Sequence, residues 1–133
     1  MLGIDFGTRN IGLARSDEMG LTVQPLASIP NRGRGDFAAR LAGLLVDGTI
    51  KGIVLGKPLN MDGSESDGSL RACRLAEFLR QETRLPVVLV DERLSTVEAL
   101  ELWRQLTPRQ QRRYRTSDSL AAALILERHL REA

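Results

Sequence analysis

The sequence predicts an α/β fold in one domain, with three strands first and helices alternating with strands after them. Short apolar runs bounded by glycine, asparagine or proline indicate five strands, at residues 2–6, 11–14, 21–29, 50–55 and 86–90. The segments between and after the last three runs carry apolar residues three or four positions apart, which is typical of helices. The alternation of helix and strand predicts parallel pairing there. A chain of 133 residues leaves no room for a second sizeable domain.

The first three strands are expected to pair antiparallel at one side of the sheet. Residues 2–6 and 11–14 are separated by four residues, the length of a hairpin connection. Pro25 lies within the third run and has no amide hydrogen to donate to a neighbour. We therefore expect the strand at 21–29 to close one edge of the sheet.

Four helical segments follow from the apolar spacing and the helix-start residues. Asp36 is expected to cap the first helix, which carries Phe37 and Leu41 on its apolar side. The second follows a long loop at 56–68 that contains glycine and aspartate. A capping-box pattern, Ser95 with Glu98, marks the start of the third helix. Pro108 either ends this helix or opens a short further turn. The last helix, from about 117 to 130, is apolar on every side over 120–126 and should pack deeply against the sheet.

Charge and composition restrict the compartment and the partners. No window approaches the roughly 20 apolar residues needed to cross a bilayer, and no signal-peptide pattern opens the chain, so a cytoplasmic protein without membrane contact is expected. A net charge of +2 says little about nucleic acid. However, residues 104–115 contain no acidic residue and can attract phosphates through the arginines of that segment, chiefly Arg109, Arg112, Arg113 and Arg115. The richness in arginine is equally consistent with genome composition.

Asp5 is the first candidate for a functional carboxylate. It lies within an apolar strand, where a carboxylate is costly unless it binds a cation or accepts good hydrogen bonds. Backbone amides of the turn at Gly7 are the alternative partners.

A second acidic position follows the last strand. Successive strand residues point to opposite faces, so only one of Asp91 and Glu92 can readily face a given site. The longer reach of Glu92 favours it, and Asp91 remains the alternative.

Asp118 supplies the third carboxylate, near the start of an apolar helix. The helix dipole favours a negative charge there, although aspartate at a helix start is also common without any function. Two strand ends and one helix start can bring Asp5, Glu92 and Asp118 together on Mg²⁺ or Mn²⁺, which prefer oxygen ligands. Two such ions can activate a water and stabilise the leaving oxygen in phosphodiester cleavage.

Four segments of the chain resemble, in order, the sequence blocks of one family. They read LGIDFGTRNIGLA at 2–14, GKPLNMDGSE at 56–65, VDERLSTVEA at 90–99 and DSLAAALIL at 118–126. The resemblance is to the YqgF family, RuvX-like and Holliday-junction-resolvase-like pre-16S rRNA nucleases. Lys57 departs from the family pattern, which commonly has an apolar residue before Pro-Leu-Asn, and the arginines at 112–115 replace a stretch that often contains lysine.

The resemblance implies both a fold and an activity. The fold is RNase H-like, a mixed five-stranded sheet in the order 3-2-1-4-5 with helices on both faces. The activity is that of a divalent-metal nuclease whose acidic triad corresponds to Asp5, Glu92 and Asp118, with Mg²⁺ or Mn²⁺ as cofactor. The family implies maturation of the 5′ end of precursor 16S rRNA, and cleavage of branched DNA is the alternative.

Further polar residues are candidates for substrate binding. Asn60 and Asp62 lie in the glycine-containing loop, in a pattern consistent with approach to a phosphate or with a solvated turn. Arg9 and Arg93 can bind phosphates or pair with neighbouring carboxylates. An actin-like ATPase shares the Asp-x-Gly-Thr hairpin, but it closes two related domains around its nucleotide. A non-catalytic nucleic-acid-binding module is a third class, which the acidic residues at all three positions oppose.

Overall fold

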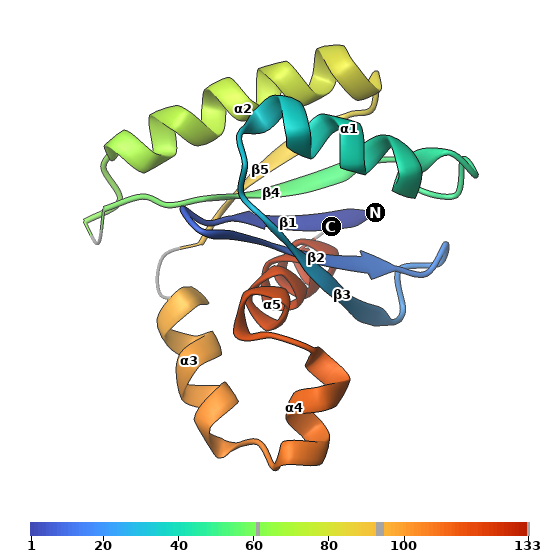
Figure 1. Cartoon of the computed structure of the whole chain (residues 1–133). Coiled ribbons are helices and arrows are strands. Elements are labelled where there is room, and N and C mark those ends of the chain that lie inside the picture. Colours follow the sequence, from blue (N-terminus) through green and yellow to red (C-terminus); the bar gives the residue numbers. More distant parts are fainter. Residues whose placement is uncertain (61, 93–94, 133) are drawn as a thin grey trace.

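The computed structural model of the chain describes residues 1–60, 62–92 and 95–132. Its central layer is a five-stranded sheet in the order β3-β2-β1-β4-β5, as predicted (Figure 1). β1 pairs antiparallel with β2 and parallel with β4, β2 pairs antiparallel with β3, and β4 pairs parallel with β5. The strands are β1 (Leu2–Phe6), β2 (Asn10–Ser16), β3 (Val23–Pro30), β4 (Ile53–Lys57) and β5 (Val87–Asp91).

Helices cover both faces of this sheet. α1 (Arg34–Leu45) and α2 (Asp67–Thr83) lie on one face, and α5 (Ser117–Glu132) lies on the other (Figure 1). α3 (Ser95–Gln105) and α4 (Pro108–Tyr114) extend from the α5 side, away from the sheet. No helix in the described part of the chain is long and apolar enough to cross a membrane.

The alternation of side chains along the strands divides the apolar core into two parts. Ile4 and Leu55 are fully buried against α1 and α2, together with Phe37 of α1. Val54 faces the other way and packs against Leu126 of α5. Because successive strand residues point to opposite faces, the residues beside Ile4, including Asp5, face α5.

Glycines on the α5 face let this helix approach the strand backbone. A Cβ atom at Gly3 would lie 2.9 Å from Cβ of Leu126. A Cβ atom at Gly12 would lie 2.0 Å from the backbone oxygen of Asp118, a separation that non-bonded atoms cannot adopt. The first turn of α5 therefore rests directly on β2, and only glycine allows this at position 12.

The structure corrects one predicted helix start. Asp36 does not cap α1, which begins at Arg34 after Gly33 and has no side-chain cap. Gly33 has φ 96°, a conformation that side-chain-bearing residues rarely adopt, and its amide donates to Oδ1 of Asn31. Asp36 instead accepts a 3.0 Å hydrogen bond from Nε of Arg40.

Other boundaries moved by a few residues. Pro25 lies in an edge strand, as predicted, because β3 is the first strand in the sheet order and pairs with β2. β4 starts at Ile53 rather than Ile50, although Ile50 is buried. Pro108 opens a separate helix, α4, capped by Thr107. The predicted capping box at Ser95 depends on the side chain of Ser95, which the structure does not describe.

Candidate active site

Asp5 lies near the carboxyl end of the central strand β1, on the face covered by α5. Its neighbour across the β1–β2 ladder is Gly12. The parallel partner of Ile4 on β4 is Leu55, so Gly56 follows on the other side of Asp5. The Asp5 carboxyl therefore stands between two positions that have no side chain.

Glu92 reaches the same place from β5. Its amide donates to the carbonyl of Lys57 at 3.1 Å, which continues the β4–β5 ladder beyond Asp91. A Cβ atom at Gly56 would lie 2.2 Å from Oε2 of Glu92. The Glu92 carboxyl thus occupies the space that a side chain at position 56 would fill.

The Asp5 and Glu92 carboxyls interact directly, and the pKa of each is raised. Burial raises the pKa of Asp5, the contact with Glu92 lowers it, and the charge of Asp118 raises it. Burial, followed by the charge and contact of Asp5, raises the pKa of Glu92 to about 8. Because the contact lowers one pKa and raises the other, Glu92 is the member of the pair that retains a proton at neutral pH.

Asp118 lies in the first turn of α5, where the backbone contact with Gly12 holds the helix against β2. Two hydrogen bonds secure this turn: the Ser119 amide donates to Oγ1 of Thr116 at 3.1 Å, and the Ser119 hydroxyl donates to the carbonyl of Leu26 on β3. Burial raises the pKa of Asp118, and a backbone hydrogen bond opposes that effect. Its carboxyl is thus close enough to Asp5 to raise that pKa by its charge.

The Asp5–Glu92 pair fits a divalent cation, although three ligands are not yet assembled. Oε2 of Glu92 is buried and has no hydrogen-bond partner among the described residues. Two adjoining, partly buried carboxyls of raised pKa would each be stabilised by a hard cation, which takes oxygen ligands. Within residues 1–60, 62–92 and 95–132, no three histidine, cysteine or acidic side chains are arranged to hold one ion. The Asp118 side chain would therefore have to turn toward the pair to become a third ligand.

Asp91 occupies a different environment from Glu92. It ends β5 opposite Lys57, and its backbone carbonyl accepts a 3.0 Å hydrogen bond from Nη1 of Arg128. Its charge acts on Glu92, whereas Asp5 responds to Glu92 and Asp118. The structure therefore brings Glu92 to Asp5, and the catalytic role of Glu92 stays a prediction.

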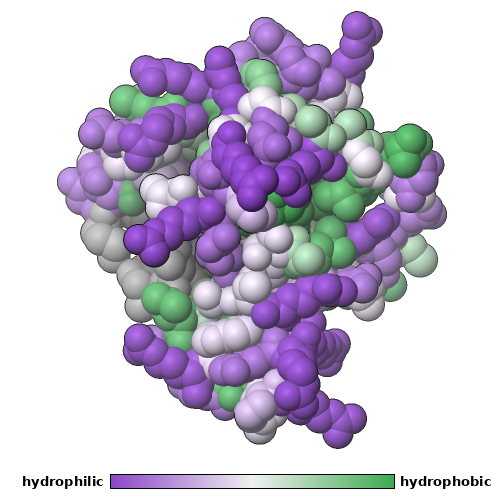
Figure 2. Space-filling model, in the orientation of Figure 1, coloured by the Kyte–Doolittle hydropathy of each residue, from purple (hydrophilic) through white to green (hydrophobic). Residues whose placement is uncertain are grey.

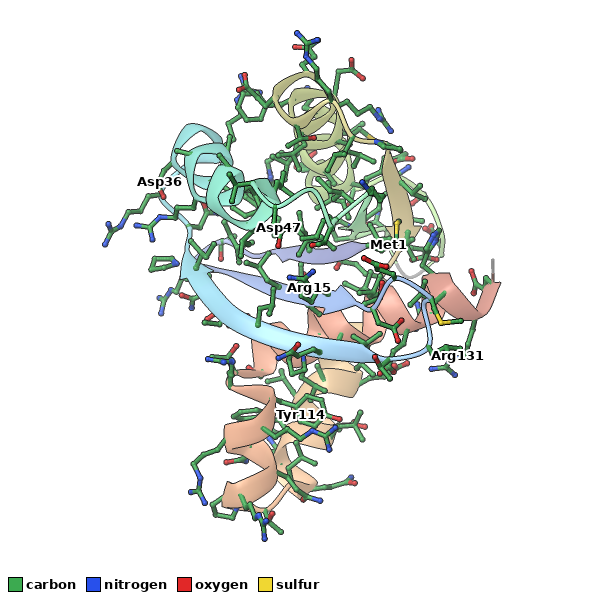
Figure 3. The ribbon with its side chains drawn as sticks, turned by 90° about the vertical axis from the view of Figure 1, so that its right-hand side faces the viewer. Met1, Arg15, Asp36, Asp47, Tyr114 and Arg131 are labelled. Atoms are coloured by element: carbon green, nitrogen blue, oxygen red, sulfur yellow. The ribbon has the colours of Figure 1, made fainter. Side chains whose placement is uncertain are left out.

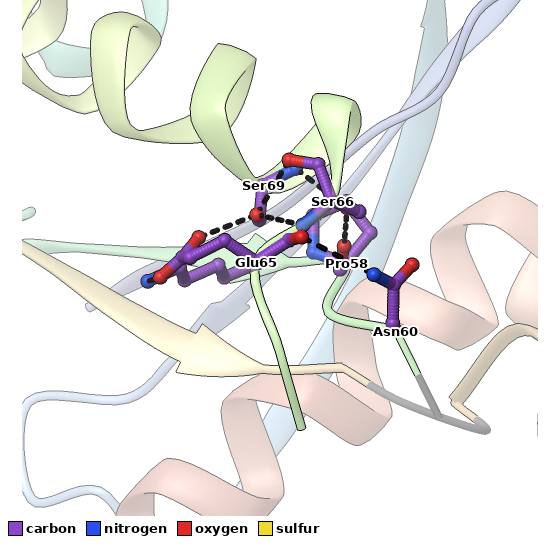
Figure 4. Close-up of polar contacts among 6 residues, drawn as sticks. Pro58, Asn60, Glu65, Ser66 and Ser69 are labelled. Atoms are coloured by element: carbon purple, nitrogen blue, oxygen red, sulfur yellow. Dashed lines mark hydrogen bonds and ion pairs between the residues drawn. The ribbon is translucent and has the colours of Figure 1, made fainter. Parts of the chain in front are cut away.

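The loop between β4 and α2 uses its polar groups to build its own turn (Figure 4). Nδ2 of Asn60 donates to Oγ of Ser64 at 3.0 Å and to the carbonyl of Glu65 at 3.2 Å. Oδ1 of Asp62 accepts from the amide of Ser64 at 2.8 Å. Nζ of Lys57 pairs with Oε1 of Glu65 at 2.5 Å. Asn60 and Asp62 are exposed, and their contact with substrate stays a prediction.

The predicted phosphate-binding arginines lie on the surface. Arg9 is exposed on the turn between β1 and β2, next to the strand that carries Asp5. Hydrophilic residues cover much of the α3–α4 region in Figure 2. All four arginines of the α4 region are exposed, and none forms an ion pair with another described residue; they are Arg109, Arg112, Arg113 and Arg115. Arg93 lies outside the described residues.

Sequence reasoning missed the residues that shape the site rather than carry charge. Gly12 admits the first turn of α5 and Gly56 admits the Glu92 carboxyl. A glycine within a strand signals a close approach, so Gly12 in the run 11–14 could have been recognised. Arg128 gave no such signal, because an arginine late in a helix is ordinary.

This sheet order, with acidic side chains at the carboxyl ends of parallel strands, defines an RNase H-like protein. The fold is similar to that of a fowlpox virus resolvase solved with Holliday junction DNA, with a TM-score of 0.57 at 12% identity, covering 98% of this chain and 96% of that one.

The family follows from the sequence comparison. Residues 1–132 match the family model described as "RuvX: Holliday junction resolvase", and the chain belongs to that family. It is 39% identical over 132 residues to a protein of Bacillus subtilis (strain 168) named "Putative pre-16S rRNA nuclease", covering 98% of this chain and 96% of the relative. A relative of the same name from Geobacillus kaustophilus (strain HTA426) is 40% identical over 131 residues, covering 97% of this chain and 95% of that one.

Proposed function

We propose that this protein is a divalent-metal-dependent nuclease that hydrolyses phosphodiester bonds at the 5′ end of precursor 16S rRNA in the cytoplasm. Membership of the RuvX family and the names of the Bacillus and Geobacillus relatives support the substrate. The observation that carries the chemistry is the direct, partly buried contact of Asp5 with Glu92 in the space left by Gly56. Without a cation such a pair costs stability, so its presence supports a site that binds one.

The side chains have distinct tasks in this proposal. Asp5 and Glu92 hold the cation, with Asp118 turning to join them, and Mg²⁺ or Mn²⁺ is the metal. When bound, such an ion polarises the phosphate and lowers the pKa of a water that attacks it. Both carboxyls must be ionised to bind the metal, so Glu92 releases its proton on binding.

The exposed arginines orient the nucleic acid. The α4 arginines directly precede α5 in the chain, and Arg115 lies three positions before Asp118. Their guanidinium groups can contact backbone phosphates on one side of the carboxyls, and Arg9 can do so from the β1–β2 turn. Asn60 and Asp62 approach the substrate from the loop after β4, and Arg93 is proposed as a further phosphate contact.

The decisive experiment compares wild type with Asp5→Asn and a matched control. Asp36→Asn removes the same charge from the first turn of α1, away from α5 (Figure 3). Each protein is incubated with Mn²⁺ or Mg²⁺ and a precursor-rRNA fragment. We expect Asp5→Asn to reduce cleavage on the order of a hundredfold or more, with Asp36→Asn close to wild type. Cleavage by Asp5→Asn equal to that of wild type would contradict the proposed site. Absence of cleavage by wild type would contradict the proposed nuclease activity.

Resolution of branched DNA is the second candidate. The family model is described as a Holliday junction resolvase, and the fold resembles a resolvase solved with junction DNA. A four-way DNA junction tested in parallel separates the two substrates. Faster cleavage of the junction than of the rRNA fragment under the same metal would favour the second candidate.

A further inference from the structure

Arg128 of α5 lies between the end of β5 and the start of α3. Its Nη1 donates to the backbone carbonyl of Asp91 at 3.0 Å. Its Nη2 lies 3.8 Å from Oε2 of Glu98, in the first turn of α3. The side chain of Arg128 is one-third exposed, with a relative accessibility of 33%. One guanidinium thus contacts the chain both before and after Glu92.

The peptide group between Asp91 and Glu92 is held from two sides. Its N–H, from Glu92, donates to the carbonyl of Lys57 on β4 at 3.1 Å. Its C=O, from Asp91, accepts from Arg128 on α5. A peptide group is planar, so two bonds on opposite edges fix its orientation and hence the direction in which the Glu92 side chain leaves the backbone.

We propose that Arg128 is a positioning residue that aims the Glu92 carboxyl at Asp5. This inference rests on the proposed nuclease function, in which that carboxyl holds the metal. The bond to the Asp91 carbonyl carries most of the effect, because a charged donor makes a stronger hydrogen bond than a neutral one. The pairing with Glu98 is longer and half exposed, and such pairs contribute little.

Four variants separate the contacts. Arg128→Met removes both contacts and keeps the apolar stem, Arg128→Lys keeps the charge with fewer donors, and Glu98→Gln removes only the ion pair. Arg131→Met is the matched control, because it removes the same charge from the same helix. Arg131 is exposed, lies in the last turn of α5 and pairs with Glu127 (Figure 3).

The main measurement is the Mn²⁺ concentration that gives half-maximal cleavage, read together with kcat at saturating Mn²⁺. We expect Arg128→Met to raise that concentration about tenfold, as is typical when a residue supporting a metal ligand is removed, with kcat largely restored by excess Mn²⁺. Arg128→Lys should fall between Arg128→Met and wild type, and Glu98→Gln and Arg131→Met should match wild type. A general loss of structure would lower kcat without rescue by Mn²⁺.

A second measurement does not depend on activity. Amide hydrogen exchange at Glu92, followed by NMR without metal, should be several-fold faster in Arg128→Met than in Arg131→Met. Equal exchange, or equal Mn²⁺ requirement in these two variants, would overturn the inference. If wild type cleaves nothing, the proposed function fails, and the exchange comparison still decides whether Arg128 holds the peptide group; if Arg128→Met does not fold, Arg128→Lys provides the same comparison.

Discussion

At the scale of single residues, Glu92 and Asp91 show how a one-position difference decides what a carboxylate can do. Glu92 extends over Gly56 to Asp5, while Asp91 lies opposite Lys57. The period of two in a strand predicted that only one of them faces the site. This period could not predict which of the two faces the site, because that depends on where β5 ends and on the space left by the absent side chain at Gly56. The sequence marked Asp5 as a candidate because a carboxylate within an apolar strand is costly, and the structure brings Glu92 to it; the catalytic role of Asp5, Glu92 and Asp118 stays a prediction.

Exchanging each carboxyl for an amide tests this difference. We expect Glu92→Gln to lower kcat by a factor on the order of 100 relative to Asp91→Asn, because the former removes a metal-binding charge. Raising Mn²⁺ should partly rescue Glu92→Gln if the defect is metal affinity. Steady-state cleavage at several Mn²⁺ concentrations measures both effects. A more damaging Asp91→Asn would transfer the role to Asp91.

The pKa of Glu92 predicts how the metal-free protein responds to pH. Its pKa rises from an ordinary 4.5 to about 8 on folding, so between these values the folded protein holds a proton that the unfolded chain has released. The free energy of unfolding should therefore fall as pH rises from about 4.5 to about 8, and level off above that. Thermal unfolding measured in a chelator between about pH 4.5 and pH 8 tests this fall in stability. Glu92→Gln should flatten the dependence and raise the melting temperature at pH 8, and an unchanged slope would contradict the assignment.

At the scale of elements, the contact between β2 and α5 determines where Asp118 lies. The apolar run of the last helix predicted deep packing, and Leu126 and Ala122 are indeed fully buried. The distance of α5 from the sheet was not predictable from apolar pattern alone, because it depends on Gly3 and Gly12 facing the helix. Asp36 failed as a helix cap for a related reason: the backbone of Gly33 took over that position.

Substitution of three glycines by alanine separates these roles. Gly12→Ala places a methyl against the α5 backbone and should lower the free energy of unfolding by about 3 kcal/mol. Gly56→Ala meets mainly the movable Glu92 carboxyl, along with Ile125, so it should reduce cleavage more than stability. Gly43→Ala is the control: the position is on the exposed side of α1, nothing lies within 4 Å of an added Cβ atom, and the change should stabilise the fold by about 0.5–1 kcal/mol. Urea unfolding and cleavage rates distinguish the three, and a Gly12→Ala protein as stable as wild type would refute the contact.

The α4 element is expected to contribute affinity rather than chemistry. Reversing Arg109, Arg112, Arg113 and Arg115 to Glu should weaken binding to RNA and reduce the slope of log affinity against log salt by about 1 for each phosphate that is no longer bound. Fluorescence anisotropy at several salt concentrations gives the slope. Four exposed arginines elsewhere make a matched control: Arg32, Arg71, Arg74 and Arg84. If both sets change the slope equally, the effect is one of net charge and α4 has no special role.

At the scale of the whole molecule, the site is assembled from distant parts of the sequence. Asp5 comes from the first strand, Glu92 follows the last strand, and Asp118 lies in the first turn of the last helix. Contacts between residues so far apart in the sequence have a high entropy cost, and they are stable only when the intervening chain is already folded. The carboxyl cluster therefore has no local unit of structure that could keep it intact while the remainder unfolds. In urea, loss of Mn²⁺ binding and loss of helix content should follow one transition with a common midpoint, and the protein should have no partly unfolded form that still cuts RNA.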